Sequence, residues 1–241
     1  MSNHVLLNNI EHKDLKIITE KSAKFGNNKT YSTVYPFEFR HAQADYPIFF
    51  LKDNQEQFSA IALFGFEQSE NLFLTNEGWQ ASYIPLMVER EPFLIGFQQN
   101  EQNEPNPVIH VDMDSPRVSE SEGIDVFLPH GGNSEFINRV STILKTIHDS
   151  KQSTDLFMET VQELDLLEPF NLDIQLNDGS NNRLTGFYTI NEDKLTQLSG
   201  DQLASLNKSG LLHLIYMVIA SHANLTALIQ KKDKLNSAAM L

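Results

Sequence analysis

The chain contains no cysteine. This excludes disulfide bonds, thiolate metal sites and a cysteine nucleophile. Positive charge is also scarce, because 18 Lys and Arg stand against 32 Asp and Glu, for a formal net charge of -14. A chain of that charge repels phosphates, which argues against nucleic-acid binding. Hydrophobic residues make up 40% of the 241 positions and 16 residues are Phe. That content excludes a disordered acidic chain and is enough for one sizeable core or two small ones.

Long uninterrupted apolar runs are missing as well. Near the N-terminus, polar residues from Asn8 onward follow only three apolar residues, whereas a secretory signal needs an unbroken apolar core. The most apolar stretch, 211–220, contains His213 and is followed by Ser221 and His222. It falls short of the roughly 18 apolar residues of a membrane span. We expect a buried helix there and no membrane span. The expected protein is soluble and cytoplasmic, unless export uses a route without a cleaved signal.

Catalytic signatures are absent from the sequence. It has no P-loop, Gly-x-Gly-x-x-Gly fingerprint, Gly-x-Ser-x-Gly elbow, His-Glu-x-x-His pair or EF-hand loop. No motif therefore names a reaction.

Strand patterns dominate the first half of the chain. Short apolar runs at 46–53, 58–66, 71–74 and 107–114 alternate with turn signals and predict strands. The polar stretch 98–107 is typical of a long loop or of a seam between two lobes.

Helices and one hairpin are predicted for the second half. Apolar residues follow the helical period at 134–148, where Ser134 can cap the helix, and again at about 154–167. The turn 177–180 lies between two alternating segments and predicts a hairpin, with Leu184, Tyr188 and Ile190 on one face. Short helices near 192–206 and a long helix from about 210 to 231 complete the chain. Strands first and helices later predict an α+β fold in a single domain over 1–241.

One strand carries the most suggestive polar cluster. His110, Asp112 and Asp114 alternate along the predicted strand 107–114, so their side chains should share one face. An imidazole and carboxylates at that spacing can begin a divalent-metal site, and His-x-Asp is two-thirds of the facial triad of non-haem iron oxygenases. His130 or His222 would have to supply a third ligand. The alternative is a solvated strand face.

The turn before the helix at 134 is a second candidate. Gly131, Gly132 and Asn133 lead into that helix, where glycine allows close backbone approach and free N–H groups can bind an anion. A tight helix entry with glycines at positive φ is the alternative. Residues 101–135 hold eight acids and one base, Arg117, giving -7. Such a surface can attract a cation or a basic partner, or simply keep the protein in solution.

Taken in order, many segments resemble the SapC family of bacterial proteins. They include LLNNIEHKDLKI at 6–17, YPIFFLKD at 46–53, ALFGFEQSENLFL at 62–74, WQASYIPLMVEREPFLIGF at 79–97, PVIHVDMDSPRVSESEG at 107–123, VFLPHGGNSEF at 126–136, ELDLLEP at 163–169, LTGFYTINEDKL at 184–195 and SGLLHLIYMVIAS at 209–221. The family name implies a surface-layer association. The resemblance also implies gene neighbourhoods with flavin-dependent tryptophan-halogenase-like proteins and TonB-dependent receptors, and hence a supporting role in uptake or metabolite modification. It carries over no catalytic residue.

Three functional hypotheses follow. The first is a non-catalytic accessory protein that binds a protein partner in a cell-envelope or nutrient-uptake system. The second is a metal-dependent enzyme of the non-haem iron type that uses His110 and Asp112. The third is a structural component of a surface layer. An exposed apolar patch of several hundred Å² is what the first hypothesis predicts.

Overall fold

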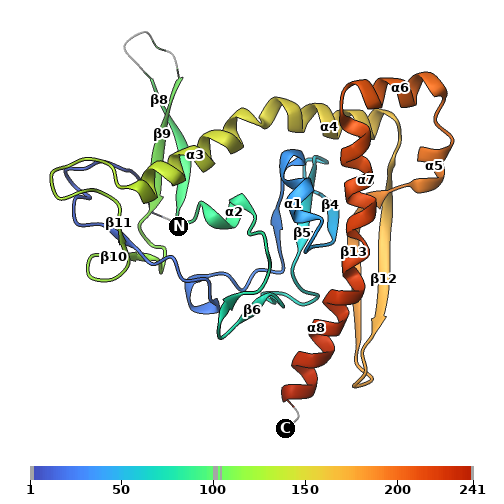
Figure 1. Ribbon diagram of the computed structural model, residues 1–241, viewed down its shortest axis with the longest axis horizontal. Coiled ribbons are helices and arrows are strands. Elements are labelled where there is room, and N and C mark those ends of the chain that lie inside the picture. Colours follow the sequence, from blue (N-terminus) through green and yellow to red (C-terminus); the bar gives the residue numbers. More distant parts are fainter. Residues whose placement is uncertain (1–2, 100–102, 104, 240–241) are drawn as a thin grey trace. The chain divides into compact units, whose positions relative to one another are not determined.

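The computed structural model describes residues 3–99, 103 and 105–239. The chain forms two compact units, and each contains two separate stretches of sequence (Figure 1). Unit 1 consists of residues 1–27 and 86–149, and unit 2 of residues 28–85 and 150–241. The seam expected near 98–107 does not coincide with a boundary between the units, because that stretch contains the ends of two paired strands. That residues 1–241 form a single domain stays a prediction.

Unit 1 contains two small antiparallel sheets and one long helix. Its elements are β1 (His4–Leu6), β2 (Lys16–Ile17), η1 (Ala23–Phe25), α2 (Leu86–Glu89), β8 (Phe93–Gln99), β9 (Pro105–Asp112), β10 (Val118–Ser119), β11 (Ile124–Asp125) and α3 (Glu135–Asp149). One antiparallel sheet has the order β1-β9-β8 and a second has the order β10-β2-β11.

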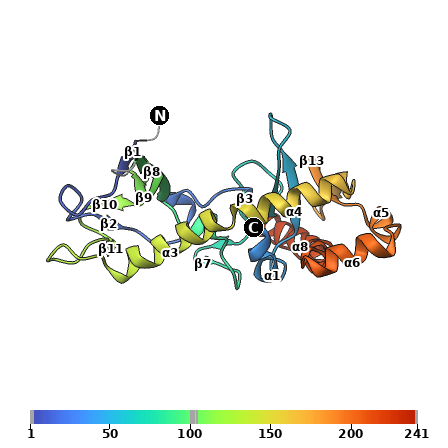
Figure 2. The ribbon, with the colours of Figure 1, turned by 90° about the horizontal axis from the view of Figure 1, so that it is seen from above.

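Helix α3 covers one face of the β1-β9-β8 sheet (Figure 2). Phe93 and Val111 project from that face and pack with Ile137, Val140 and Leu144 of the helix. These helical positions follow the predicted period, so the amphipathic pattern at 134–148 is confirmed with bounds one residue later. The opposite face of the sheet carries the even-numbered residues of β9.

A buried cation fixes the N-terminal segment of unit 1. Arg117 is 1% exposed. Its Nη1 donates to the carbonyl oxygens of Ile18 and Glu20 at 2.9 and 2.8 Å, and its Nη2 donates to Asn27 Oδ1. The guanidinium also lies 5.8 Å from the ring centre of Phe25. Burial lowers the pKa of Arg117, against the nearby charges of Glu91 and Glu20, but an arginine remains charged. Arg117, the only Lys or Arg between 101 and 135, therefore stabilises the interior of unit 1 by binding the segment 18–27.

Unit 2 contains a five-stranded antiparallel sheet and most of the helices. Its elements are β3 (Tyr31–Thr33), η2 (Pro36–Glu38), α1 (Phe39–Ala42), β4 (Ile48–Lys52), β5 (Phe58–Leu63), β6 (Leu74–Thr75), β7 (Gly78–Trp79), α4 (Lys151–Glu163), β12 (Leu167–Gln175), β13 (Asn181–Ile190), α5 (Glu192–Thr196), α6 (Gly200–Lys208), α7 (Leu211–Ser221) and α8 (Asn224–Ala239). The sheet order is β12-β13-β4-β5-β3. The α+β prediction is confirmed: strands dominate the first half, and helices with the β12–β13 hairpin dominate the second.

Strand β4 is covered on both faces. The ring of Phe49 stacks on that of His222, directly after α7, at 4.9 Å between ring centres, whereas Phe50 lies 6.4 Å from Phe157 of α4. Successive side chains of a strand point to opposite faces, so α4 packs on the face away from His222. Both phenylalanines are fully buried. This double burial explains why the strand reads as an unbroken apolar run.

The predicted hairpin forms, but one of its predicted faces is wrong. The turn closes through a hydrogen bond of 2.9 Å from Leu176 N to Ser180 O. Phe170 pairs with Phe187 and Leu172 pairs with Leu184, so the register shifts by one residue between the pairs. Gly186 lies in this interval with φ 82°, as the extra residue of a β-bulge can require. The bulge moves Tyr188 to the face opposite Leu184, where it contacts Phe58.

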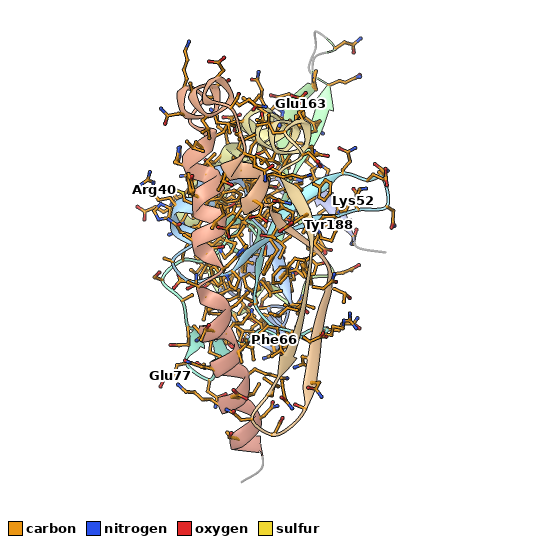
Figure 3. The ribbon with its side chains drawn as sticks, turned by 90° about the vertical axis from the view of Figure 1, so that its right-hand side faces the viewer. Arg40, Lys52, Phe66, Glu77, Glu163 and Tyr188 are labelled. Carbon is orange, nitrogen blue, oxygen red and sulfur yellow. The ribbon has the colours of Figure 1, made fainter. Side chains whose placement is uncertain are left out.

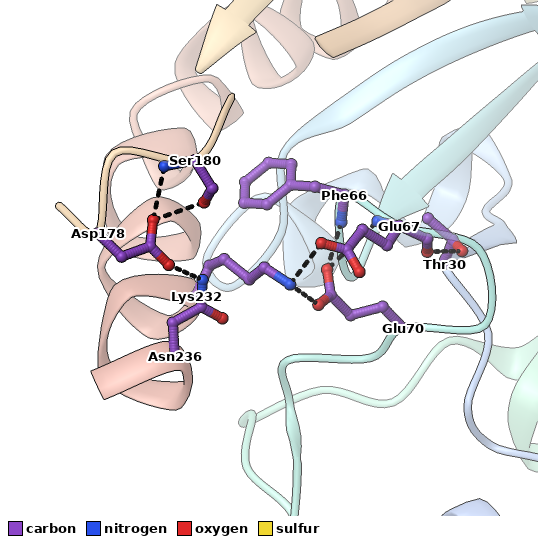
Figure 4. A network of polar contacts seen from close by, with 8 residues as sticks. All are labelled: Thr30, Phe66, Glu67, Glu70, Asp178, Ser180, Lys232 and Asn236. Atoms are coloured by element: carbon purple, nitrogen blue, oxygen red, sulfur yellow. Dashed lines mark hydrogen bonds and ion pairs between the residues drawn. The ribbon is translucent and has the colours of Figure 1, made fainter. Parts of the chain in front are cut away.

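Helices α7 and α8 follow each other with a single turn between them; we call them together the C-terminal helix. A buried lysine attaches its second half to two carboxylates of the loop after β5 (Figure 4). Lys232 is 5% exposed, and its Nζ donates to Glu67 Oε1 at 2.7 Å and to Glu70 Oε1 at 2.6 Å. The other oxygen of Glu70 accepts the backbone N–H of Phe66 at 2.8 Å. A Cβ at Gly65 would lie 2.7 Å from the carbonyl oxygen of Glu70, so only glycine fits there.

Replacing Lys232 with methionine should destabilise the protein. The change leaves two facing carboxylates without their cation, and we expect the free energy of unfolding at pH 7 to fall by about 2–3 kcal/mol in urea denaturation. The matched control Lys234→Gln, on the exposed side of the same helix, should stay within about 0.5 kcal/mol of wild type.

The pH dependence of this difference gives a second readout. Burial opposes the charge of Lys232, but the hydrogen bonds to Glu67 and Glu70 outweigh it and raise the pKa of Lys232. A raised pKa gives stabilisation that is complete below the unfolded value of about 10.4 and is lost as the pH rises through the folded value. As the pH is raised from 7, the difference in unfolding free energy between wild type and Lys232→Met should therefore stay constant until about pH 10.4 and narrow above it. Equal stability of the two proteins at pH 7 would contradict the account.

Candidate functional site

The face of the β1-β9-β8 sheet away from α3 carries the predicted polar cluster. His110 and Asp112 lie on β9 with their side chains on this face, as the alternation predicts. Asp114 follows the end of the strand and is exposed. Strand β1 adds a residue that the sequence interpretation missed: His4 lies opposite Asp112, and its Nε2 is 3.9 Å from Asp112 Oδ2. The face therefore holds two imidazoles and one half-buried carboxylate.

Gly96 of β8 leaves the space that the His110 ring occupies. A Cβ at Gly96 would lie 2.6 Å from both Cδ2 and Nε2 of His110. Gly96 pairs with Val108, so His110 is its diagonal neighbour on the same face. A glycine inside an apolar strand was the available signal for such a close approach.

Asp112 also organises the turn that follows β9. Its Oδ1 accepts the backbone N–H of Asp114 at 3.2 Å, and its carbonyl oxygen accepts the N–H of Ser115 at 3.1 Å. Within the residues that the structure describes, no group of three or more His, Asp or Glu side chains is placed to hold a metal ion. A divalent-metal site at His110 and Asp112 stays a prediction.

The loop between β11 and α3 forms a tight turn. Gly131 has φ 86° and its N–H donates to Leu128 O at 2.8 Å, while Leu128 N donates to Gly132 O at 2.6 Å. Asn9 Nδ2 donates to Gly131 O at 2.8 Å. Asn133 forms an isolated β-bridge with Phe127, and His130 is exposed at the tip of the turn. The N–H and carbonyl groups of Gly131 and the carbonyl group of Gly132 are thus used in hydrogen bonds within the protein. Anion binding at Gly131, Gly132 and Asn133 stays a prediction.

Several acidic residues of the segment 101–135 lie at the surface of unit 1. Glu120 and Glu122 are exposed, whereas Asp125 forms an ion pair with Lys16 of β2. Because Arg117 is buried, the exposed side chains of this segment are more uniformly negative than its composition suggests.

Unit 2 contains a buried carboxylate that sequence reasoning did not single out. Glu38 is 1% exposed; its Oε1 accepts from the hydroxyl of Tyr83 at 2.7 Å and its Oε2 accepts from the backbone N–H of Tyr35 at 2.9 Å. Tyr46 donates to the carbonyl oxygen of Tyr83 and accepts from Trp79 Nε1 at 2.8 Å. Burial raises the pKa of Tyr46 despite the bond from Trp79. Three of these four bonds join the 79–83 segment to the 35–46 segment, and the fourth, between Tyr35 and Glu38, lies within 35–46. The network therefore holds these two segments of unit 2 together.

His222 connects the C-terminal helix to the start of β4. Its Nε2 lies 3.1 Å from the carbonyl oxygen of Ile48 and 3.2 Å from Thr189 Oγ1, and its ring stacks on Phe49 at 4.9 Å between ring centres. Ser221 Oγ accepts the backbone N–H of Ile48 at 2.9 Å. Burial lowers the pKa of His222, which favours a neutral ring at pH 7. His222 therefore serves unit 2 as a clamp for β4.

The C-terminal helix is only half buried, which corrects the expectation of a buried helix (Figure 3). Leu211, Ile215, Val218 and Leu228 face the sheet and are at most 7% exposed, but Tyr216 is 53% exposed. Among the described residues one helix, Leu211–Ala238, is long and apolar enough to cross a membrane by length and composition, and 22% of its apolar window is buried. That it does not span a membrane stays a prediction.

The fold is an α+β fold with no assembled metal group among the described residues. The model of the SapC family matches residues 7–228, nearly the whole chain, so the protein belongs to the SapC family. This confirms the resemblance found in the sequence. No curated protein and no solved structure matches the chain.

A double-mutant cycle tests the packing of His110 over Gly96. Gly96→Ala places a methyl group inside the imidazole contact, and we expect a loss of about 1–2 kcal/mol in the free energy of unfolding. In a His110→Ala background the loss should shrink by at least about 0.5 kcal/mol. Gly200→Ala is the control, because nothing lies within 4 Å of its added Cβ. Equal losses in the two backgrounds would show that the ring does not fill this space.

Proposed function

We propose that the protein is a non-catalytic accessory protein of a cell-envelope or nutrient-uptake system, and that it binds a protein partner through the exposed face of the C-terminal helix. Membership of the SapC family supports the envelope setting. The observation that carries the binding role is the uncharged, exposed face of a helix that is already held on its other side.

The exposed face forms a continuous stripe. Tyr216, Ala220, Ala223 and Ala227 are all exposed and follow one another at helical spacings of four, three and four, so they lie on one side of the helix. No Asp, Glu, Lys or Arg occurs between Lys208 and Lys231. Exposed helix faces of soluble proteins normally carry charged residues, and an uncharged one is typical of an interaction surface.

A protein partner fits this stripe better than a lipid surface does. The net charge of -14 disfavours approach to anionic membranes. Three alanines beside one tyrosine leave the helix backbone accessible, which suits close packing of a partner helix at about 8–10 Å between axes. The tyrosine supplies a large, rigid contact of the kind enriched at interface centres.

A charge placed in the stripe should abolish partner binding without harming the fold. We expect Ala220→Glu to lower by at least about tenfold the recovery of specific partners from the native bacterium, compared with wild type, by quantitative mass spectrometry. Ala204→Glu, at an exposed position of α6, is the matched control and should retain them. Recovery that is the same for Ala220→Glu and wild type would exclude this surface.

Two further measurements separate the alternatives. A surface-layer subunit should form ordered assemblies with divalent cations, whereas an accessory protein should remain a small species in sedimentation. A metal-dependent enzyme should retain metal when purified without a His tag; the accessory function predicts below about 0.1 equivalent of iron, zinc or manganese. Stoichiometric metal that is lost in His110→Ala would favour the enzyme.

A further inference from the structure

A pocket of about 230 Å³ lies in unit 1, between the C-terminal half of α3 and strands β8 and β9. The apolar part of its wall comes from both sides, with Ile95 and Ile109 on the strands and Leu144 on the helix. The volume is below the roughly 300 Å³ at which pockets for drug-sized ligands begin. A ligand that fits it is therefore small and has an apolar body.

Helix α3 places polar groups along one edge of this pocket. Ser141, Lys145 and His148 line it at spacings of four and three, so they lie on one side of the helix. Among the described residues, neither the side chain of Ser141 nor that of Lys145 forms a hydrogen bond or an ion pair. His148 lies at the far end, where its ring contacts Phe97 at 5.5 Å between ring centres.

On the other side of α3, the cation Arg139 is neutralised by a carboxylate of the protein. A second pocket there contains Arg139, but Arg139 Nη2 donates to both oxygens of Glu89 at 3.1 and 3.0 Å. Lys145 has no such partner among the described residues. Within the described part of the chain, the cation on one side of the helix is therefore paired and the cation on the other side is not.

Asp149 also lines the pocket, and its negative charge disfavours a second anion at that end. Ser141 and Asp149 are eight residues apart, about 12 Å along the helix. Lys145 lies between them, one helical turn from each. An anion held by Ser141 and Lys145 therefore lies on the side of Lys145 that faces away from the Asp149 carboxylate. The apolar part of the ligand would then lie against the wall formed by Ile95, Ile109 and Leu144.

We propose that this pocket binds a small amphipathic monocarboxylate. Lys145 Nζ and Ser141 Oγ donate to its carboxylate, and its hydrocarbon or aryl body packs against Ile95, Ile109 and Leu144. The site lies in unit 1 and uses no residue of the C-terminal helix. This proposal is therefore independent of the proposed partner surface.

Titration with octanoate tests the proposal, by calorimetry and by NMR of methyl groups in the full-length protein. We expect saturable binding with shifts centred on Ile95, Ile109 and Leu144. Octanol and octylammonium, which have the same chain without the negative charge, should bind at least about fivefold more weakly. Absence of saturation up to about 5 mM octanoate, or equal binding of octylammonium, would overturn the proposal. A Kd of 5 mM corresponds to a binding free energy of only about 3 kcal/mol.

Variants identify the residues. Lys145→Gln should weaken octanoate binding about tenfold, as expected for loss of a charge-assisted hydrogen bond. Lys208→Gln, at an exposed lysine of α6, should leave binding unchanged. Ala220→Glu should also leave it unchanged, which separates this site from the partner surface. Unaltered affinity in Lys145→Gln, or shifts confined to the C-terminal helix, would overturn the assignment.

Discussion

Unit 2 depends on the position of β4. This strand pairs with β5 on one side and with β13 on the other, through Leu51 with Phe187 and Phe50 with Tyr188. It therefore joins two stretches of chain that more than a hundred residues separate. At its first residue, Ile48, the backbone N–H and carbonyl oxygen are bonded by Ser221 and His222 of the C-terminal helix. Such satisfaction of buried backbone groups is obligatory, so the helix is part of the sheet's hydrogen bonding as well as of its packing.

The exposed stripe of the C-terminal helix follows from this attachment. The clamp at Ile48 fixes the middle of the helix, and the ion pair of Lys232 with Glu67 and Glu70 fixes its second half. Two anchors that far apart set the rotation of the helix about its axis. The apolar residues that face away from the sheet therefore remain exposed in a fixed arrangement. A preformed surface of this kind loses little conformational entropy when a partner binds.

Local patterns predicted the elements well and the long-range contacts poorly. The helix at 134–148 and the turn at 177–180 carry their own signals, in a 3.6-residue period and in an Asn-Asp-Gly sequence, and both form. The β-bulge at Gly186 also forms, but the sequence interpretation did not predict it. Whether the strand continues or forms a bulge is decided by its pairing with Phe170 and Leu172. The half-exposed state of 211–228 was missed for a related reason: composition reports how apolar a helix is, not how many of its faces another element covers.

The polar residues also divide into those that a local pattern predicted and those whose surroundings depend on distant parts of the chain. Alternation along β9 placed His110 and Asp112 on one face correctly. The neighbours that define that face, His4 and Gly96, come from other strands and depend on register. Arg117 looks like a lone surface base in the sequence, and only the tertiary structure surrounds it with the carbonyl oxygens of Ile18 and Glu20.

The most direct test of the partner surface is hydroxyl-radical footprinting of Tyr216 in intact native cells and in purified protein. Tyr31, which is 44% exposed in the same unit, is an internal reference for the 53% exposed Tyr216. The account predicts that oxidation of Tyr216 relative to Tyr31 falls at least about fivefold in cells, because a partner that binds the stripe covers its largest side chain. An unchanged ratio of the two tyrosines would contradict it.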